Sequence, residues 1–255
     1  MSKYKFGWKP DLPDRRDFKY TLQELKPIQT IYLAKKYKMP LPYDQGNLGS
    51  CTANALSFLV HFDLLNRNCV KISNPFLPSR LFIYYYERVL EGTISSDAGA
   101  ELRDGIKAIA SNGVPSEDLW PYNINEFTSK PSSRSIISAL NFQALEYQRL
   151  DNTNKQQLVN CLLNGFPICF GMTCYESFLS DQVAASGIIP MPDYDERIVG
   201  GHAMTIVGFS KEYDAFIVRN SWGIHWGQEG YCRIPADLIC DDNVCDDFWT
   251  ITKIS

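Results

Sequence analysis

The pattern of apolar and polar residues divides the chain into a half that favours helices and a half that favours strands. Residues 52–65 contain no glycine or proline and are apolar around nearly the whole helical circumference, which predicts a helix buried on most sides. Further helices are expected over residues 78–90 and 102–111, because glycine follows each of them. The second half predicts a helix over residues 155–163, followed by strands at residues 168–173, 203–209, 215–219 and 248–252.

This separation of helices from strands predicts an α+β fold, with a helical lobe packed against an antiparallel sheet or barrel. We place the helical lobe at residues 45–145, and the β lobe at residues 146–255 together with a strand region at 27–44. Residues 1–26 are rich in charge and proline and show neither a helical nor a strand period. They predict an extended N-terminal arm in front of a main domain formed by residues 27–255.

Charge and hydropathy exclude two classes of partner. The net charge is only -4, and no cluster of lysine and arginine is long enough to follow a phosphate backbone. No apolar run has membrane-spanning length, and the N-terminus lacks the apolar segment of a secretory signal. We therefore expect no nucleic-acid or membrane partner, and we favour the cytoplasm or another reducing compartment.

The eight cysteines are expected to be mostly reduced thiols, with one late disulfide as an alternative. Neither Cys240 with Cys245 nor Cys169 with Cys174 has the close spacing or the neighbouring histidine of a zinc site. We expect no metal and no cofactor.

One cysteine stands where reactivity is expected. Cys51 follows the glycine-containing stretch that begins at Gln45, and it directly precedes the predicted buried helix. At the first turn of a helix, unpaired N–H groups and the positive end of the helix dipole stabilise a thiolate and lower the pKa of the cysteine. The same N–H groups can bind a developing oxyanion.

A thiolate nucleophile also needs an imidazole as its acid/base partner, and the chain has three histidines. His61 lies several turns along the helix from Cys51, and His225 lies in a turn rich in tryptophan and glycine, so a structural role is expected for both. His202 follows two glycines and opens an apolar strand, which lets its ring project into a cleft. Asn220 offers a side-chain amide to orient that ring, and Trp222 offers an indole to shield the pair.

These segments, in this order, resemble the papain/cathepsin family of cysteine peptidases. The resemblance rests on residues 45–51, 201–203 and 220–231, with a weaker likeness over residues 97–122. It implies a helical left lobe and a β-barrel right lobe that meet at a cleft. It also implies the role of each site residue: Cys51 as nucleophile, His202 as acid/base, Asn220 as orienter and Gln45 in oxyanion binding, with Gly99 and Gly201 on the non-primed side of the substrate site and Trp222 on the primed side.

The implied activity is that of an endopeptidase that acts on protein or peptide substrates through a thioester acyl-enzyme. Two alternatives stay open: acyl transfer or removal of a small modifier at the same site, and an inactive binding protein on the same fold. The chain departs from the family signature at Leu48, where a cysteine is usual, and at Thr52, where an aromatic is usual. The lost cysteine removes a disulfide of secreted relatives, which agrees with a reducing compartment.

The N-terminal arm carries Trp8 and Phe18 within an otherwise polar segment, and these aromatic side chains need a surface on which to pack. We expect the arm to lie near the cleft and to restrain activity as an intramolecular inhibitor, which would make the chain a zymogen. The alternative is a structural strap that only covers apolar surface.

Overall fold

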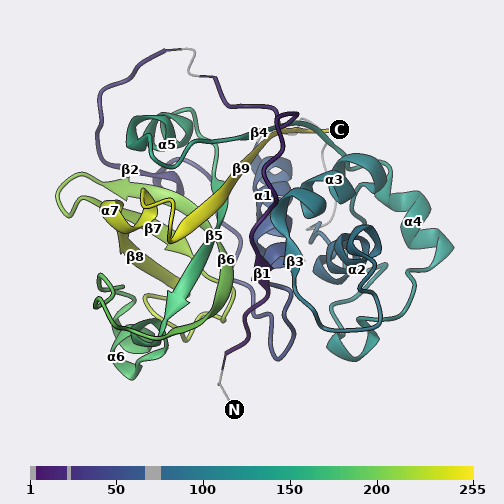
Figure 1. Ribbon diagram of the computed structural model, residues 1–255. Helices are drawn as coiled ribbons and strands as arrows, with labels where there is room; N and C mark the ends of the chain where they lie inside the picture. The colour runs from purple at the N-terminus through teal and green to yellow at the C-terminus, as the bar shows by residue number, and fades with distance from the viewer. Residues whose placement is uncertain (1–3, 22–23, 67–75) are drawn as a thin grey trace.

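The structure is a computed structural model that describes residues 4–21, 24–66 and 76–255. One lobe is mostly helical, the other holds the large sheet together with several short helices, and the arm runs along the boundary between them (Figure 1). The α-helices are α1 (Cys51–Asn66), α2 (Arg80–Glu91), α3 (Leu102–Asn112), α4 (Ser133–Ala139), α5 (Lys155–Leu163), α6 (Asp181–Ser186) and α7 (Ala236–Ile239). The strands are β1 (Trp8–Lys9), β2 (Ile31–Tyr32), β3 (Ala100–Glu101), β4 (Ala144–Arg149), β5 (Ile168–Tyr175), β6 (Ile198–Ser210), β7 (Ala215–Arg219), β8 (Tyr231–Pro235) and β9 (Cys245–Ile254).

Helix α1 forms the centre of the molecule. Every residue from Cys51 to Leu64 is buried, which confirms the prediction of a helix covered on most sides. It contacts α2 and α3 in the helical lobe and β5, β6 and β9 in the β lobe. A helix between two layers has no polar face to give to solvent, so its apolar residues spread around its circumference.

The other predicted helices are also present, with small shifts at their ends. Helix α2 begins two residues later than expected because Ser79 caps it, its side chain accepting a hydrogen bond from the N–H of Phe82 at 3.2 Å. It ends at Gly92, which has φ 71°. Helix α5 has the bounds that were predicted from the sequence.

The β lobe holds a seven-stranded sheet in the order β4-β9-β5-β6-β7-β8, and β2 pairs with β6. All of these strand pairs are antiparallel. The expected β-barrel was wrong in one respect, because the sheet is not closed. The outer edge of β4 is used by the arm, since Phe18 O accepts from Arg149 N at 2.7 Å and Tyr20 N donates to Arg149 O at 2.8 Å.

Strand β6 begins earlier than the sequence suggested. His202 was expected to open a strand, but β6 starts at Ile198 and pairs with β5 from there. The two glycines before His202 lie within β6 and allow close approach of the arm. A Cβ atom on Gly201 would lie 2.4 Å from the carbonyl oxygen of Trp8.

In the described part of the chain, the seven cysteines are free thiols, so the alternative of a late disulfide finds no support there. No described helix combines the length and the apolar character needed to cross a membrane. The limits proposed above for the arm and the two lobes stay predictions.

Candidate active site

The predicted nucleophile, Cys51, is the first residue of α1 and is fully buried. The preceding turn is held by Gly49, whose N–H donates to both carboxylate oxygens of Asp97 at 2.9 and 3.1 Å. The Cys51 thiol takes a backbone hydrogen bond from Ala203, the residue after His202. The start of α1 therefore reaches β6 directly beside the predicted acid/base residue.

His202 and Asn220 lie together on neighbouring elements, β6 and the end of β7. The Nε2 atom of His202 lies 2.7 Å from Oδ1 of Asn220, and this oxygen also accepts from the N–H of Ser221 at 2.7 Å. Because a carbonyl oxygen only accepts, Nε2 of His202 carries the proton and Nδ1 is the basic nitrogen. Nδ1 is buried and has no hydrogen-bond partner among the described residues.

Aromatic side chains surround the imidazole. Trp222 stacks on His202 with ring centroids 4.6 Å apart, and Phe178 meets it edge-on at 6.2 Å. The indole of Trp222 thus packs against the imidazole that bonds Asn220. Burial also disfavours the charged ring and lowers the pKa of His202 to about 4.

Gln45 lies between the two lobes. Its N–H donates to Ser221 O at 2.9 Å, and its side-chain oxygen accepts from the Ser221 hydroxyl at 2.6 Å. These bonds leave the amide Nε2 facing Leu48 O at 2.9 Å and Lys5 O at 3.2 Å. The donor expected to bind an oxyanion therefore bonds a carbonyl of the arm.

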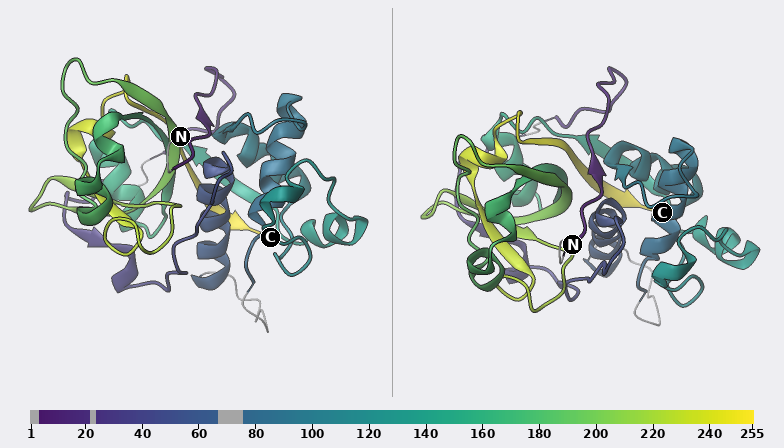
Figure 2. Two further views of the ribbon diagram at one scale, coloured as in Figure 1. Left: turned by 90° about the horizontal axis from the view of Figure 1, so that it is seen from below. Right: turned by 60° about the horizontal axis from the view of Figure 1, so that its bottom comes forward.

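The arm passes directly over these residues, and Figure 2 shows its described part lying along the boundary of the lobes. Tyr4 stacks on Trp222 with centroids 4.2 Å apart, and Phe6 meets both His202 and Trp222 edge-on at 6.0 Å. The N–H of Gly7 donates to Gly201 O at 3.0 Å, while Gly7 O accepts from Ala100 N at 2.7 Å.

The predicted substrate-binding residues all contact this arm. Beyond the stacking on Trp222, a Cβ atom on Gly99 would lie 2.1 Å from Gly7 O, and Gly99 has φ 70°. Only glycine fits there while the arm is bound. Gly99, Gly201 and Trp222 thus line one continuous track, which the arm fills from Tyr4 to Trp8.

The structure differs from one sequence-based expectation about acidity. The Cys51 pKa was expected to be lowered at the helix start, but burial raises it to about 12 in this arm-covered state. The backbone hydrogen bond from Ala203 opposes the rise without overcoming it. Under the arm, both the thiol and the imidazole are therefore neutral at pH 7.

The other two histidines have the structural settings that were expected. His61 is buried, with Nδ1 2.8 Å from the hydroxyl of Tyr43, and burial lowers its pKa to about 4. His225 lies in an exposed loop at the rim. Neither bonds Cys51 or Asn220.

Sequence reasoning missed a charged cluster that fixes the arm to both lobes. Asp17 of the arm bonds Arg103 of α3 at 2.7 and 2.9 Å and Arg149 of β4 at 3.1 Å. Asp11, also of the arm, is buried and donates through its N–H to Asp247 Oδ2 at 2.8 Å. The only available signal was the density of charge at residues 11–17, which does not name partners so distant in the chain.

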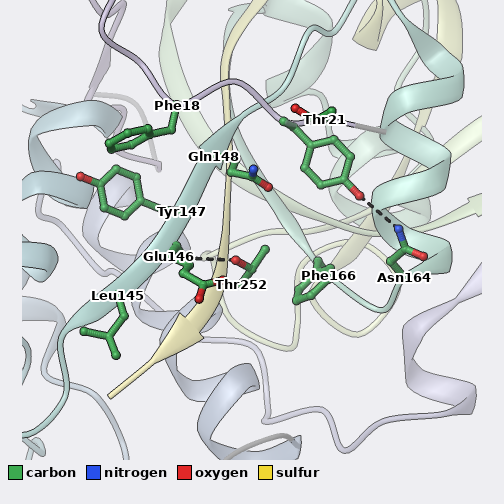
Figure 3. Close-up of a pocket in the computed structure, with 10 residues that line it drawn as sticks. Phe18, Thr21, Leu145, Glu146, Tyr147, Gln148, Asn164, Phe166 and Thr252 are labelled. Carbon is green, nitrogen blue, oxygen red and sulfur yellow. Dashed lines mark hydrogen bonds between the residues drawn. The ribbon is translucent and has the colours of Figure 1, made fainter. Parts of the chain in front are cut away.

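The two aromatic residues of the arm have different settings. Trp8 is only 6% exposed and lies over β5 and β6. Phe18 is 63% exposed and contacts Tyr147 edge-on at the rim of a separate hollow of about 640 Å³, between the arm and β4 (Figure 3). None of the predicted catalytic residues lines this hollow. The clearest anchor of the arm is therefore Trp8.

Comparison with known proteins agrees with this geometry. The sequence model of the papain family cysteine proteases matches residues 94–246. An uncharacterised peptidase C1-like protein of Acanthamoeba polyphaga mimivirus is 38% identical over 275 residues, which cover 98% of this chain and 87% of that protein. Ananain of Ananas comosus is 26% identical over 79% of this chain and 54% of its own length.

Solved structures of cysteine proteases are also similar to this chain. Xylellain, a cysteine protease of Xylella fastidiosa, superposes with a TM-score of 0.89 at 36% identity, covering 100% of this chain and 98% of its own. The Carica candamarcensis cysteine protease CMS1MS2 has a TM-score of 0.65 at 19% identity over 89% of this chain and 99% of its own, which supports the fold alone. The chain belongs to the papain family of cysteine proteases.

Proposed function

We propose that this protein hydrolyses peptide bonds through Cys51, His202 and Asn220, and that the N-terminal arm keeps it latent. The observation that carries the proposal is the pairing of His202 Nε2 with Asn220, which leaves Nδ1 basic and without a partner where α1 brings Cys51. Such a nitrogen accepts the thiol proton.

The chemistry follows from these positions. Once Nδ1 of His202 takes the proton, the Cys51 sulfur attacks the substrate carbonyl and forms a tetrahedral oxyanion. Gln45 Nε2 and the N–H of Cys51 bind that oxyanion. His202 then gives its proton to the leaving amine, and the thioester that remains is hydrolysed by water, which His202 deprotonates. Asn220 holds the ring in register throughout.

The arm suppresses this sequence in three ways. Its Lys5 carbonyl bonds the Gln45 amide, its aromatic residues cover His202, and it adds to the burial of a site in which burial raises the pKa of Cys51 and lowers that of His202. A neutral thiol is a poor nucleophile. Proforms are also among the solved structures with this fold, including that of the ragweed protease Amb a 11.

The arm is also oriented to resist cleavage. It runs from Trp222, on the proposed primed side, to Gly201 and Gly99, on the proposed non-primed side. A substrate runs from the non-primed to the primed side. The arm therefore crosses the site in the reverse direction and presents its peptide groups with the wrong polarity for attack.

The test uses a chain that folds with its arm in place. We would insert the recognition sequence of a specific protease at the exposed turn between Arg15 and Arg16, and cut it after folding. Cutting should convert a chain with little activity into one that cleaves peptides and reacts with E-64 at Cys51, the inhibitor bound to the Carica enzyme. Cys51→Ala is the control for both measurements, peptide cleavage and reaction with E-64.

The alternative functions predict different results in this test. An added amine that captures most of the acyl group would favour acyl transfer over hydrolysis. A cut chain that neither cleaves peptides nor labels at Cys51 would contradict the proposed function and favour an inactive binding protein.

A further inference from the structure

The arm residue Trp8 occupies a pocket whose floor holds a buried carboxylate. Its indole lies over Gly171 of β5 and Gly201 of β6, where a Cβ atom on Gly171 would approach the ring to 1.8 Å. Its Nε1–H donates to Asp247 Oδ2 at 3.0 Å. The pocket thus combines a flat slot for an aromatic ring with one acceptor at its end.

Asp247 is aimed into this pocket by the backbone of β9. Between Cys169↔Trp249 and Gly171↔Asp246, β9 contains one more residue than β5, which is a β-bulge. Asp247 lies in that bulge with φ 58°, and its side chain is fully buried. A buried, left-handed aspartate is conformationally costly, and such positions are typical of functional sites.

The hydrogen bonds of Asp247 divide between the arm and the main domain. Oδ1 accepts from Arg149 Nη2 at 2.9 Å, and this partner belongs to β4. Oδ2 accepts only from the arm in the described structure, from Trp8 Nε1 and from Asp11 N. When the arm leaves, Oδ2 loses both donors and faces the pocket, and an unsatisfied buried oxygen favours any occupant that restores a donor.

We propose that Asp247 is a specificity-determining residue, which selects substrates with a large, neutral aromatic side chain carrying an N–H or O–H donor, tryptophan above all, in the Trp8 pocket. This proposal rests on the peptidase function proposed above. The pocket adjoins Gly201, so the selected residue lies on the non-primed side.

The charges around the pocket favour a neutral donor over a cation. Without the arm, Asp246 and Asp247 face Arg149 and the nearby Arg103, which balances two carboxylates against two guanidinium groups. A lysine or arginine of the substrate would add a third positive charge there. An aromatic N–H satisfies Oδ2 without that repulsion.

The first experiment measures the pocket without catalysis. In the full chain, Trp8→Ala opens the slot, and calorimetry compares indole with benzothiophene, which has the same shape but no N–H. We expect indole to bind about 2- to 10-fold more tightly, the range for one net hydrogen bond, because Asp11 N still donates to Oδ2 in the uncut chain. Asp247→Asn should reduce that ratio, and asparagine tolerates the left-handed backbone of Asp247.

The second experiment measures specificity in the chain cut between Arg15 and Arg16. Peptides that differ only in tryptophan, tyrosine, phenylalanine, leucine or arginine at the residue bound in this pocket are compared by kcat/KM. We expect tryptophan to exceed phenylalanine about tenfold or more, and Asp247→Asn to bring the ratio close to one. Asp246→Asn is the matched control, because Asp246 also bonds Arg149 but does not contact Trp8, and it should keep the ratio.

The outcomes separate the two proposals. Hydrolysis with equal rates for tryptophan and phenylalanine, or with arginine preferred, would overturn the role of Asp247 and retain the peptidase. Indole selectivity in a chain that cleaves no peptide would retain the pocket and overturn the peptidase function. If Trp8→Ala does not fold, Trp8→Phe in the full chain keeps the ring and removes only the N–H, and an unfolding free energy equal to that of the wild type would count against the bond.

Discussion

At the scale of single residues, the proposed mechanism depends on the pair His202 and Asn220. Their hydrogen bond of 2.7 Å fixes the tautomer of the imidazole, and Trp222 shields it. Asn220 cannot itself take a proton, so its effect is to orient the ring.

Replacing Asn220 by alanine should lower kcat/KM of the cut chain about 10- to 100-fold, which is typical when the group that orients a functional histidine is lost. Gln148→Ala, a β4 residue at the separate hollow, is the control and should be neutral. Steady-state kinetics with one peptide measures both variants. An activity equal to wild type in Asn220→Ala would show that the ring needs no orienter.

From the raised pKa of Asp247 we also predict that the free energy of unfolding depends on pH. Burial and the neighbouring Asp11 raise the pKa of Asp247 to about 8, well above its unfolded value of 3.8. Between these values the folded chain holds the extra proton, so the free energy of unfolding falls as pH rises, by at most about 1.4 kcal/mol per pH unit. Urea unfolding of wild type and Asp247→Asn at pH 5 and pH 8 measures the difference.

The wild type should lose more stability than Asp247→Asn between the two pH values. His202 and His61 have lowered pKa values, and they cost stability at the acid end in both chains. Comparing the two slopes therefore isolates the contribution of Asp247 together with that of its buried neighbour Asp11, whose pKa is also raised by burial. Parallel slopes would mean that its carboxyl group stays ionised in the folded chain.

At the scale of elements, the sequence predicted those helices, strands and site residues that a short stretch of the chain specifies by itself. Helix α1 was readable because its residues are apolar all round, and Cys51, His202, Asn220 and Gln45 could be selected because each lies in a recognisable motif. The early start of β6 was missed because the strand was expected to open at His202, after Gly200 and Gly201. The two glycines make room for the arm, and a long-range contact of this kind cannot be predicted from the local sequence.

Contacts between residues that are far apart in the sequence could not be predicted either. The bond between Asp11 and Asp247 joins residues that are 236 positions apart, and nothing in either segment names the other. The same holds for the outer edge of β4, which the arm occupies. Such contacts depend on the path of the arm over the folded domain.

Gly7, the residue directly before β1, gives a prediction about the path of the arm. A Cβ atom on Gly7 would lie 1.9 Å from the carbonyl oxygen of Gly49, a residue whose N–H is held by Asp97 at 2.9 Å. Gly7→Ala should therefore displace the arm at a cost of about 1–3 kcal/mol and raise peptide hydrolysis by the uncut chain at least about fivefold. Leu12→Ala, at an arm side chain that is 76% exposed, is the matched control and should leave activity low.

At the scale of the whole molecule, the arm holds the two lobes across the site. Asp17 bonds Arg103 of the helical lobe and Arg149 of the β lobe, while Trp8 and Phe6 fill the space between. This arrangement exceeds what a strap over apolar surface requires, because the Lys5 carbonyl also takes the Gln45 donor. We therefore favour inhibition over a purely structural role.

Reactivity of Cys51 tests this view without any substrate. With the arm bound, burial raises the pKa of Cys51 to about 12, so almost no thiolate exists at pH 7 and alkylation by iodoacetamide should be slow. Cutting between Arg15 and Arg16 exposes the sulfur and the imidazole to solvent, and the rate at Cys51 should rise at least about tenfold. Mass spectrometry resolves each cysteine, so Cys169 and Cys232, which are buried in the β lobe with pKa values also raised by burial, serve as internal controls. An equal rise at all three would mean that the cut loosens the whole fold, whereas an unchanged rate at Cys51 would mean that the arm does not control access to the thiol.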